Sequence, residues 1–118
     1  MLTACGNTSK SQSILTGNYT EDTIAVAKSL KETIALPKDS EELETKEDDA
    51  VNLITDYMSI YRNRPQVNEL DSFTTMQTAL NSLAGHYKTF SNRPVPESLK
   101  ERLNKELEKA QIEVNRDS

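Results

Sequence analysis

Residues 73–90 read FTTMQTALNSLAGHYKTF and carry the clearest helical periodicity in the chain. Their large apolar side chains recur at alternating steps of three and four, at Phe73, Met76, Leu80, Leu83, Tyr87 and Phe90. This spacing places the apolar side chains along one side of an α-helix, as at the seam of a helix bundle. The pattern predicts a helix over about 70–91, with Asp71 or Ser72 as its N-cap.

Three other stretches show the same periodicity, and prolines separate them. We expect helices over about 19–36, 40–62 and 96–116, capped by Asn18 or Thr20 in the first and by Ser40 in the second. Their expected core positions are Ile24, Ala27, Leu30, Ile34, Leu43, Ala50, Leu53, Ile54, Tyr57, Tyr61, Leu99, Leu103, Leu107 (or Glu106), Ala110 and Val114. Four helices with short connections predict an all-α fold, an antiparallel up-down-up-down four-helix bundle.

Composition excludes several classes of protein. The chain has 118 residues, enough for one domain, and a net charge of -5 that would repel nucleic acid. A single cysteine cannot form an internal disulfide, and one histidine leaves too few ligands for a zinc, haem or iron–sulfur site. No glycine-rich phosphate loop and no G-x-S-x-G motif is present. We therefore expect no catalytic residues, no metal and no cofactor, and a monomer when the protein is free.

The net charge is concentrated in residues 38–49, KDSEELETKEDD, which hold seven acidic and two basic residues. Acidic residues at the start of a helix complement its dipole, and this is the favoured interpretation. A divalent-cation site is the alternative, although the spacing of a calcium-binding loop is missing.

The N-terminus reads Leu2-Thr3-Ala4-Cys5-Gly6, the pattern that bacterial lipoprotein signal peptidase cleaves before a lipid-modified cysteine. The polar residues 6–18 would then form a flexible tether. We expect residues 1–18 to be a truncated lipobox with its tether and 19–116 to be the bundle. A chance terminal cysteine is the alternative, and because only four residues precede Cys5, most of a signal peptide would be missing.

The predicted third helix contains a run without formal charge, from Ser72 to Tyr87. Small uncharged residues face away from its apolar stripe, namely Thr74, Thr78, Asn81, Ser82 and Gly85. Such a surface is suited to binding a partner protein, because charged residues are depleted at interface cores. The alternative is that this helix is the most enclosed member of the bundle and shows little surface.

Several motifs together resemble one family. They are Gly17-Asn18-Tyr19, Asp22-Thr23, the block from Phe73 to Tyr87, and Asn92-Arg93-Pro94 followed by Pro96. They look like the small lumenal lipoprotein that assists assembly and repair of photosystem II in cyanobacteria, which has a plant chloroplast counterpart. The resemblance covers about residues 15–116.

The resemblance implies a non-enzymatic assembly factor that is held on the lumenal side of the thylakoid membrane by lipid on Cys5. Its implied partner is the photosystem II core, at the large lumenal loop of the inner-antenna chlorophyll protein of 43-kDa type. Binding would precede construction of the manganese cluster and attachment of the extrinsic subunits. Two alternatives stay open: a lipid-anchored periplasmic adaptor, and a metal carrier that uses residues 38–49.

Overall fold

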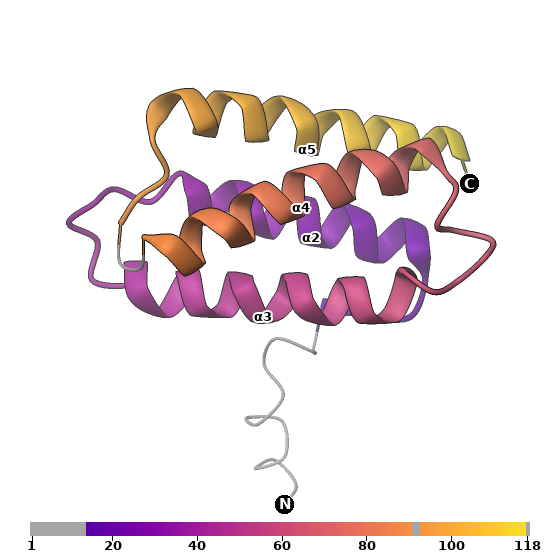
Figure 1. The fold of residues 1–118 in the computed structure, drawn as a ribbon, viewed down its shortest axis with the longest axis horizontal. Helices are drawn as coiled ribbons and strands as arrows, with labels where there is room; N and C mark the ends of the chain where they lie inside the picture. The colour runs from indigo at the N-terminus through magenta and orange to yellow at the C-terminus, as the bar shows by residue number, and fades with distance from the viewer. Residues whose placement is uncertain (1–13, 91–92, 118) are drawn as a thin grey trace, which may run out of the picture.

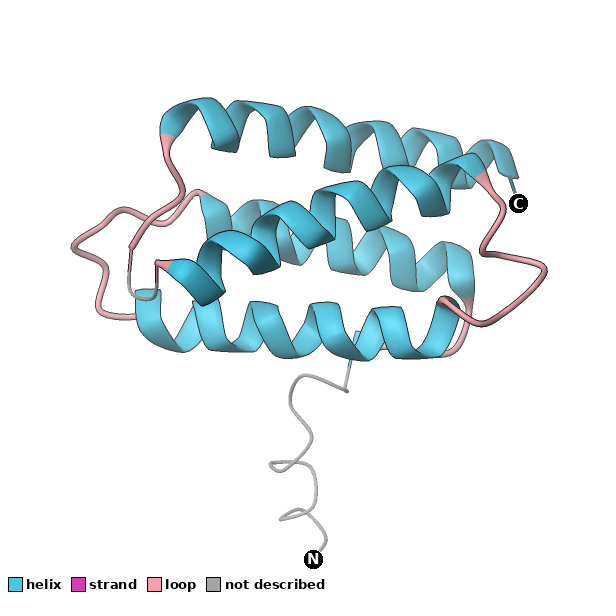
Figure 2. Ribbon diagram, in the orientation of Figure 1, coloured by secondary structure: helices cyan, strands magenta, loops and turns pink. Residues whose placement is uncertain are grey.

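The computed structural model describes residues 14–90 and 93–117, and within these the regular structure is helical (Figures 1 and 2). The long helices are α2 (Tyr19–Ile34), α3 (Leu43–Tyr61), α4 (Asp71–Thr89) and α5 (Glu97–Asp117). The predicted all-α fold is therefore confirmed, and each predicted helix boundary lies within about three residues of the observed one.

The helices form a closed ring in which each packs against the next and α5 returns to α2. Figure 1 shows them side by side along the long axis of the molecule, with α5 at the top, α3 at the bottom and α4 in front of α2. Short connections reverse the chain between successive helices, so neighbours run antiparallel. This arrangement is the predicted up-down-up-down bundle.

The core is lined by the apolar stripes that the sequence predicted, with differences in three helices, among them α5, where the predicted Leu99 is only half-buried. In α2, Val26 is fully buried whereas the predicted Ile24 is half-buried, so the buried face is rotated from the expected stripe. Phe90 was expected to close the seam of α4, but it follows the helix as its C-cap and is 48% exposed. The interior also holds polar side chains, among them Asp22 and Thr23.

The sequence predicted the N-cap of α2 correctly and the N-cap of α3 wrongly. Asn18 caps α2 as predicted, since its side chain accepts a hydrogen bond of 2.9 Å from the backbone N–H of Glu21. Ser40 was the wrong N-cap for α3, which begins at Leu43 with Glu42 in the cap position. Residues 40–43 form a separate turn, because the carbonyl of Ser40 accepts from the N–H of Leu43 at 3.3 Å.

The predicted caps of α4, Asp71 and Ser72, were also wrong. Leu70 occupies the N-cap position and makes no side-chain capping bond. Ser72 is instead buried, and its hydroxyl lies 2.7 Å from the hydroxyl of Tyr19 on α2. Its backbone N–H donates to the carboxylate of Asp117 on α5 at 3.3 Å. A neighbouring helix thus supplies the acceptor that a local side chain was expected to provide.

Residues 14–18, within the predicted tether, lie against the bundle. Leu15 packs on the core, and Gly17 adopts a positive φ of 92°, which favours glycine. This turn lets the backbone N–H groups of Thr16 and Gly17 both reach the carboxylate of Asp22. Cys5 and the rest of the predicted lipobox lie outside the described residues.

Candidate functional site

The five residues proposed to bind a partner lie on one outward face of α4, opposite its buried seam. Thr74, Thr78, Asn81 and Gly85 are exposed and Ser82 is half-buried. Their spacing of three or four residues keeps them on neighbouring turns of the helix. We call these five residues the α4 stripe, and the fold brings all of them together.

The polar groups of the α4 stripe are largely satisfied within the protein. The hydroxyl of Thr78 donates to the backbone carbonyl of Thr74 at 3.0 Å. The hydroxyl of Thr74 donates to the backbone carbonyl of Leu70 at 3.4 Å. The hydroxyl of Ser82 accepts from the guanidinium of Arg102 on α5. The stripe therefore offers a neutral surface of small side chains, with the cation of Arg102 at its edge. A partner can cover this surface at little desolvation cost.

The structure contradicts the alternative in which α4 is the most enclosed helix. Seven of its nineteen residues are buried, against eight of the nineteen in α3. A shallow groove of about 250 Å³ also opens beside the stripe, between α4 and α5. Because Thr74, Thr78, Asn81 and Gly85 are exposed and still uncharged, burial alone does not account for the uncharged run from Ser72 to Tyr87.

Gly85 stands out within the α4 stripe. It lies inside a helix, where glycine costs about 1 kcal/mol relative to alanine. A Cβ atom added there would meet no other atom within 4 Å. Packing within the described residues therefore gives no reason for glycine at this position.

A buried carboxylate, which the sequence analysis missed, holds residues 16–17 to the bundle. Asp22 is 0% exposed and accepts a 2.6 Å hydrogen bond from the hydroxyl of Tyr61 on α3. It also accepts from the N–H groups of Thr16 and Gly17, at 2.7 and 3.0 Å, and from the hydroxyl of Thr16 at 3.0 Å. We call this arrangement the Asp22 latch.

Two opposing effects set the pKa of Asp22. Burial raises the pKa, but the hydrogen bonds from Tyr61, Thr16 and Gly17 stabilise the ionised form and bring the pKa below its ordinary value. The pKa of Tyr61 is raised, first by burial and then by its bond to the carboxylate. Both shifts keep Tyr61 a donor and Asp22 an acceptor at neutral pH.

Tyrosines extend this polar layer through the bundle. The hydroxyl of Tyr57 lies 2.7 Å from that of Thr23, and the Tyr57 and Tyr61 ring centroids are 5.1 Å apart. The ring of Tyr19 meets that of Tyr61 edge-on at 5.3 Å. These contacts join α2 to α3 and have the geometry of a structural core.

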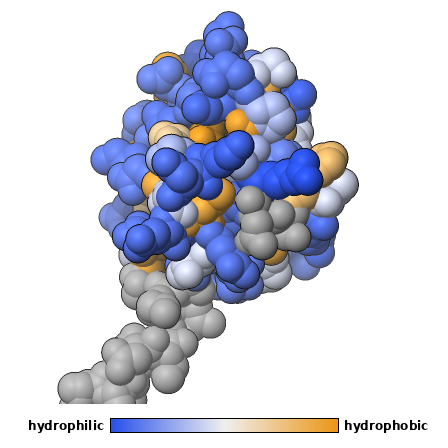
Figure 3. Space-filling view, turned by 90° about the vertical axis from the view of Figure 1, so that its left-hand side faces the viewer, coloured by the Kyte–Doolittle hydropathy of each residue, from blue (hydrophilic) through white to orange (hydrophobic). Residues whose placement is uncertain are grey.

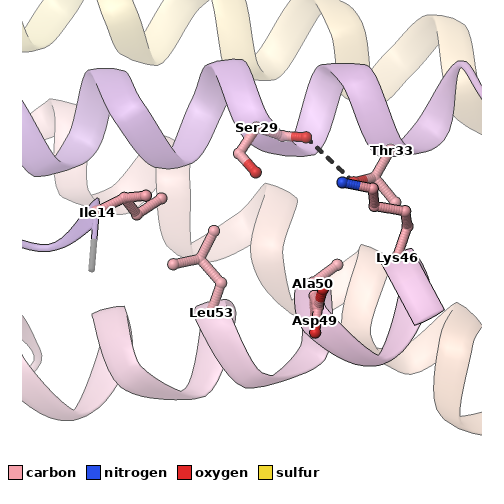
Figure 4. Close-up of a pocket in the computed structure, with 7 residues that line it drawn as sticks. All are labelled: Ile14, Ser29, Thr33, Lys46, Asp49, Ala50 and Leu53. Carbon is pink, nitrogen blue, oxygen red and sulfur yellow. Dashed lines mark hydrogen bonds between the residues drawn. The ribbon is translucent and has the colours of Figure 1, made fainter. Parts of the chain in front are cut away.

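A small cavity of about 130 Å³ lies between α2 and α3 (Figure 4). Ile14 reaches its edge from the N-terminal side, and Leu53 and Ala50 line it from α3. Its other walls are polar, from Ser29 and Thr33 on α2 and Lys46 and Asp49 on α3, and its volume is below the range typical of a cofactor pocket. This cavity therefore marks where the chain preceding α2 meets the bundle.

The acidic segment gains no support as a metal site. Nowhere in residues 14–90 and 93–117 do three or more histidine, cysteine, aspartate or glutamate side chains form a group that could hold a metal ion. The helices in these same ranges are also too short or too polar to span a bilayer.

Comparison with known proteins identifies the family. A family model described as Photosystem II Pbs27 matches residues 3–112. This protein belongs to that family. A relative from Thermosynechococcus vestitus, the photosystem II assembly factor lipoprotein Psb27, is 42% identical over all of this chain and 86% of its own length. The photosystem II lipoprotein Psb27 of Synechocystis sp. is 47% identical, over 98% of this chain and 83% of its own.

Solved structures of the family share the fold. The solution structure of Psb27 from cyanobacterial photosystem II superposes with a TM-score of 0.83 at 47% identity, over 88% of this chain and 90% of that one. The crystal structure of PSB27 from Arabidopsis thaliana superposes with a TM-score of 0.81 at 26% identity, over 85% of this chain and 98% of that one. The resemblance noted in the sequence is confirmed, and so is the expectation that the protein is not an enzyme, because a relative matched along the whole chain is named an assembly factor, which is a non-catalytic role.

Proposed function

We propose that this protein is a photosystem II assembly and repair factor that binds the lumenal side of the immature core. The observation that carries the proposal is the match along the whole chain to a relative named as a photosystem II assembly factor. Its proposed target is the large lumenal loop of the 43-kDa inner-antenna chlorophyll protein. Binding there would precede construction of the manganese cluster and attachment of the extrinsic subunits.

The α4 stripe is the proposed contact surface. Four of its five residues are exposed, it is neutral over several turns, and the hydroxyls of Thr74 and Thr78 are already bonded to the helix backbone. An uncharged surface of this kind resembles the core of a protein interface. Gly85 supports the same conclusion, because a residue without a side chain allows a partner backbone to approach closely.

A lipid on Cys5 is the proposed anchor. Both curated relatives are named lipoproteins, and the residues before Cys5 form a lipobox. The anchor would hold the protein to the thylakoid membrane on its lumenal side, and we propose that the free protein is monomeric.

Charge and backbone variants of the α4 stripe test the contact surface. Thr78→Glu adds one negative charge to an exposed position, so the free energy of unfolding should change by no more than about 0.5 kcal/mol. Capture of photosystem II from cyanobacterial thylakoids should fall at least tenfold, because docking would bury an unpaired charge. Gly85→Ala should raise the free energy of unfolding by about 1 kcal/mol and still weaken capture.

The matched control is Lys105→Gln on α5, which changes the net charge by the same amount as Thr78→Glu at another exposed position. It should leave both stability and capture unchanged. Normal capture by Thr78→Glu and Gly85→Ala would exclude the α4 stripe as the contact. Failure of the wild-type chain to capture photosystem II would reject the proposed function itself.

A further inference from the structure

A pocket opens at the end of the bundle where α4 finishes and α5 begins. It has a volume of about 570 Å³ and is lined by Lys38, His86, Phe90, Arg93, Pro94 and Pro96. Figure 3 views the molecule from this end and shows apolar patches enclosed by hydrophilic side chains. A pocket of this size accommodates a few side chains of a ligand.

One part of the pocket is apolar. Phe90 is 48% exposed, and its ring centroid lies 5.3 Å from that of His86, which is in the last turn of α4. Pro94 and Pro96 line the same space. Aromatic and proline walls lose little conformational freedom when an apolar side chain packs on them, and aromatic grooves recur in peptide-binding domains.

The pocket also brings together two cations from different connections. Lys38 belongs to the α2–α3 loop and Arg93 to the chain between α4 and α5, and both are exposed. Neither side chain has an ion-pair partner among the carboxylates of residues 14–90 and 93–117, and no acidic residue lines the pocket. This local charge is opposite in sign to the net charge of -5 on the chain.

His86 adds an unsatisfied polar group. Its Nε2 atom is buried and has no hydrogen-bond partner in the described part of the chain. Buried polar atoms are normally paired, so a ligand that supplies a hydrogen bond here would remove a cost that the free protein carries.

We infer that this pocket binds an acidic peptide segment. A carboxylate of the peptide pairs with Lys38 and Arg93, and a neighbouring aromatic or aliphatic side chain packs on Phe90 and the prolines. This inference rests on the proposed function and deepens it, because the segment would belong to the photosystem II partner and would extend the contact beyond the α4 stripe.

Charge distribution favours a peptide over an anionic lipid surface. Lys38 also borders Glu41 and Glu44, which belong to the acidic segment 38–49. A membrane carries negative charge over a wide area and would be repelled by that segment, whereas a short peptide can place one carboxylate beside the two cations inside a pocket that no acidic residue lines. The apolar wall requires a side chain beside the charge, which inorganic phosphate lacks.

The test uses three synthetic peptides and the natural label that the chain provides. The probe is acetyl-Gly-Asp-Phe-Glu-Gly-amide, and its analogues carry Asn and Gln in place of the acids or Ala in place of Phe. The chain contains a single histidine, so the imidazole signals in an NMR titration report on His86 without ambiguity. The acidic aromatic probe should move these signals, and both analogues should bind about tenfold more weakly.

Variants of the two cations complete the experiment. Lys38→Gln and Arg93→Gln should each weaken binding of the probe about threefold to tenfold, and more in combination. Arg116→Gln, an exposed cation at the C-terminal end of α5, is the matched control and should have no effect. Added salt should weaken wild-type binding, since the contact is an ion pair near the surface.

Three results would overturn the inference. The first is equal affinity for the acidic probe and its amide analogue. The second is an equal loss of probe affinity in Arg116→Gln and Arg93→Gln. The third is movement of the His86 signals by phosphatidylglycerol vesicles or phosphate but not by the probe. Because the probe contains no part of photosystem II, its failure leaves the proposed function standing. The proposed function fails on a separate result, when the wild-type chain captures no photosystem II.

Discussion

At the scale of single residues, Asp22 shows where sequence reasoning ends. An acidic residue in the first turn of a helix predicts a surface group that complements the helix dipole. In the structure its partner Tyr61 is 39 positions away along the chain, so no local pattern could reveal the contact. His86 lies in the last turn of α4, but the pocket beside it depends on two separate connections and could not be predicted.

The Asp22 latch should make stability depend on acid. A carboxylate with a lowered folded-state pKa stabilises the protein above its unfolded-state pKa, near 3.8, and this contribution disappears as the pH falls through the folded-state pKa. Asp22→Asn should therefore lower the free energy of unfolding by about 1–3 kcal/mol at pH 7 and by less at pH 2.5. Urea denaturation at both pH values measures the two differences.

Asp39→Asn provides the control, because Asp39 is an exposed carboxylate in the α2–α3 loop. It should change the free energy of unfolding little at either pH. An equal loss at pH 7 and pH 2.5 in Asp22→Asn would show that the charge of Asp22 does not contribute to stability.

At the scale of helices, the periodicity of apolar residues predicted which side of each helix is buried. Tertiary contacts determined where the helices begin and end. The stripes in α3 and α5 were predicted almost completely, because a bundle helix can bury only one side. The caps of α4 were wrong, because Ser72 is committed to Tyr19 and because Asp117 reaches the end of the helix from α5. Phe90 was misplaced because the helix ends one residue before it.

Truncation of the α4 seam should destabilise the fold strongly. Leu80 is 0% exposed and Leu83 is 1% exposed, so either change to alanine should cost about 2–5 kcal/mol through lost burial and a residual cavity. Asn81→Ala, on the exposed side of the same turn, should stay within about 0.5 kcal/mol of wild type. Urea unfolding compares the three, and small losses in both leucine variants would argue against this packing.

At the scale of the whole molecule, the two ends of the bundle differ in chemistry. The Asp22 latch lies at the start of α2, while the pocket and the acidic segment lie at the opposite end (Figure 1). The overall fold was predictable because four amphipathic helices with short connections have few ways to bury their stripes. The pocket and the latch were not, because each joins segments that are distant in the sequence.

The proposed anchor makes a prediction about the location of the protein. When the chain is expressed in a cyanobacterium behind a full signal peptide, the wild type should fractionate with thylakoid membranes. Cys5→Ser should release it, because each buried CH₂ group of the lipid contributes about 0.8 kcal/mol. Immunoblots of washed membranes measure the two fractions, and Thr3→Ser serves as the control beside the cysteine. Equal retention of Cys5→Ser and wild type would contradict the anchor.

The Asp22 latch also sets the length of the leash on which an anchored domain would move. Holding Thr16 to α2 leaves about eleven residues after Cys5, which span at most about 40 Å, against about 50 Å if the leash continued to Tyr19. The volume that the domain can search grows roughly as the cube of this radius, so the latch raises the effective concentration of the domain near the bilayer about twofold. A hydrogen-bonded carboxylate in the core would thereby govern how often the protein meets a membrane-bound partner.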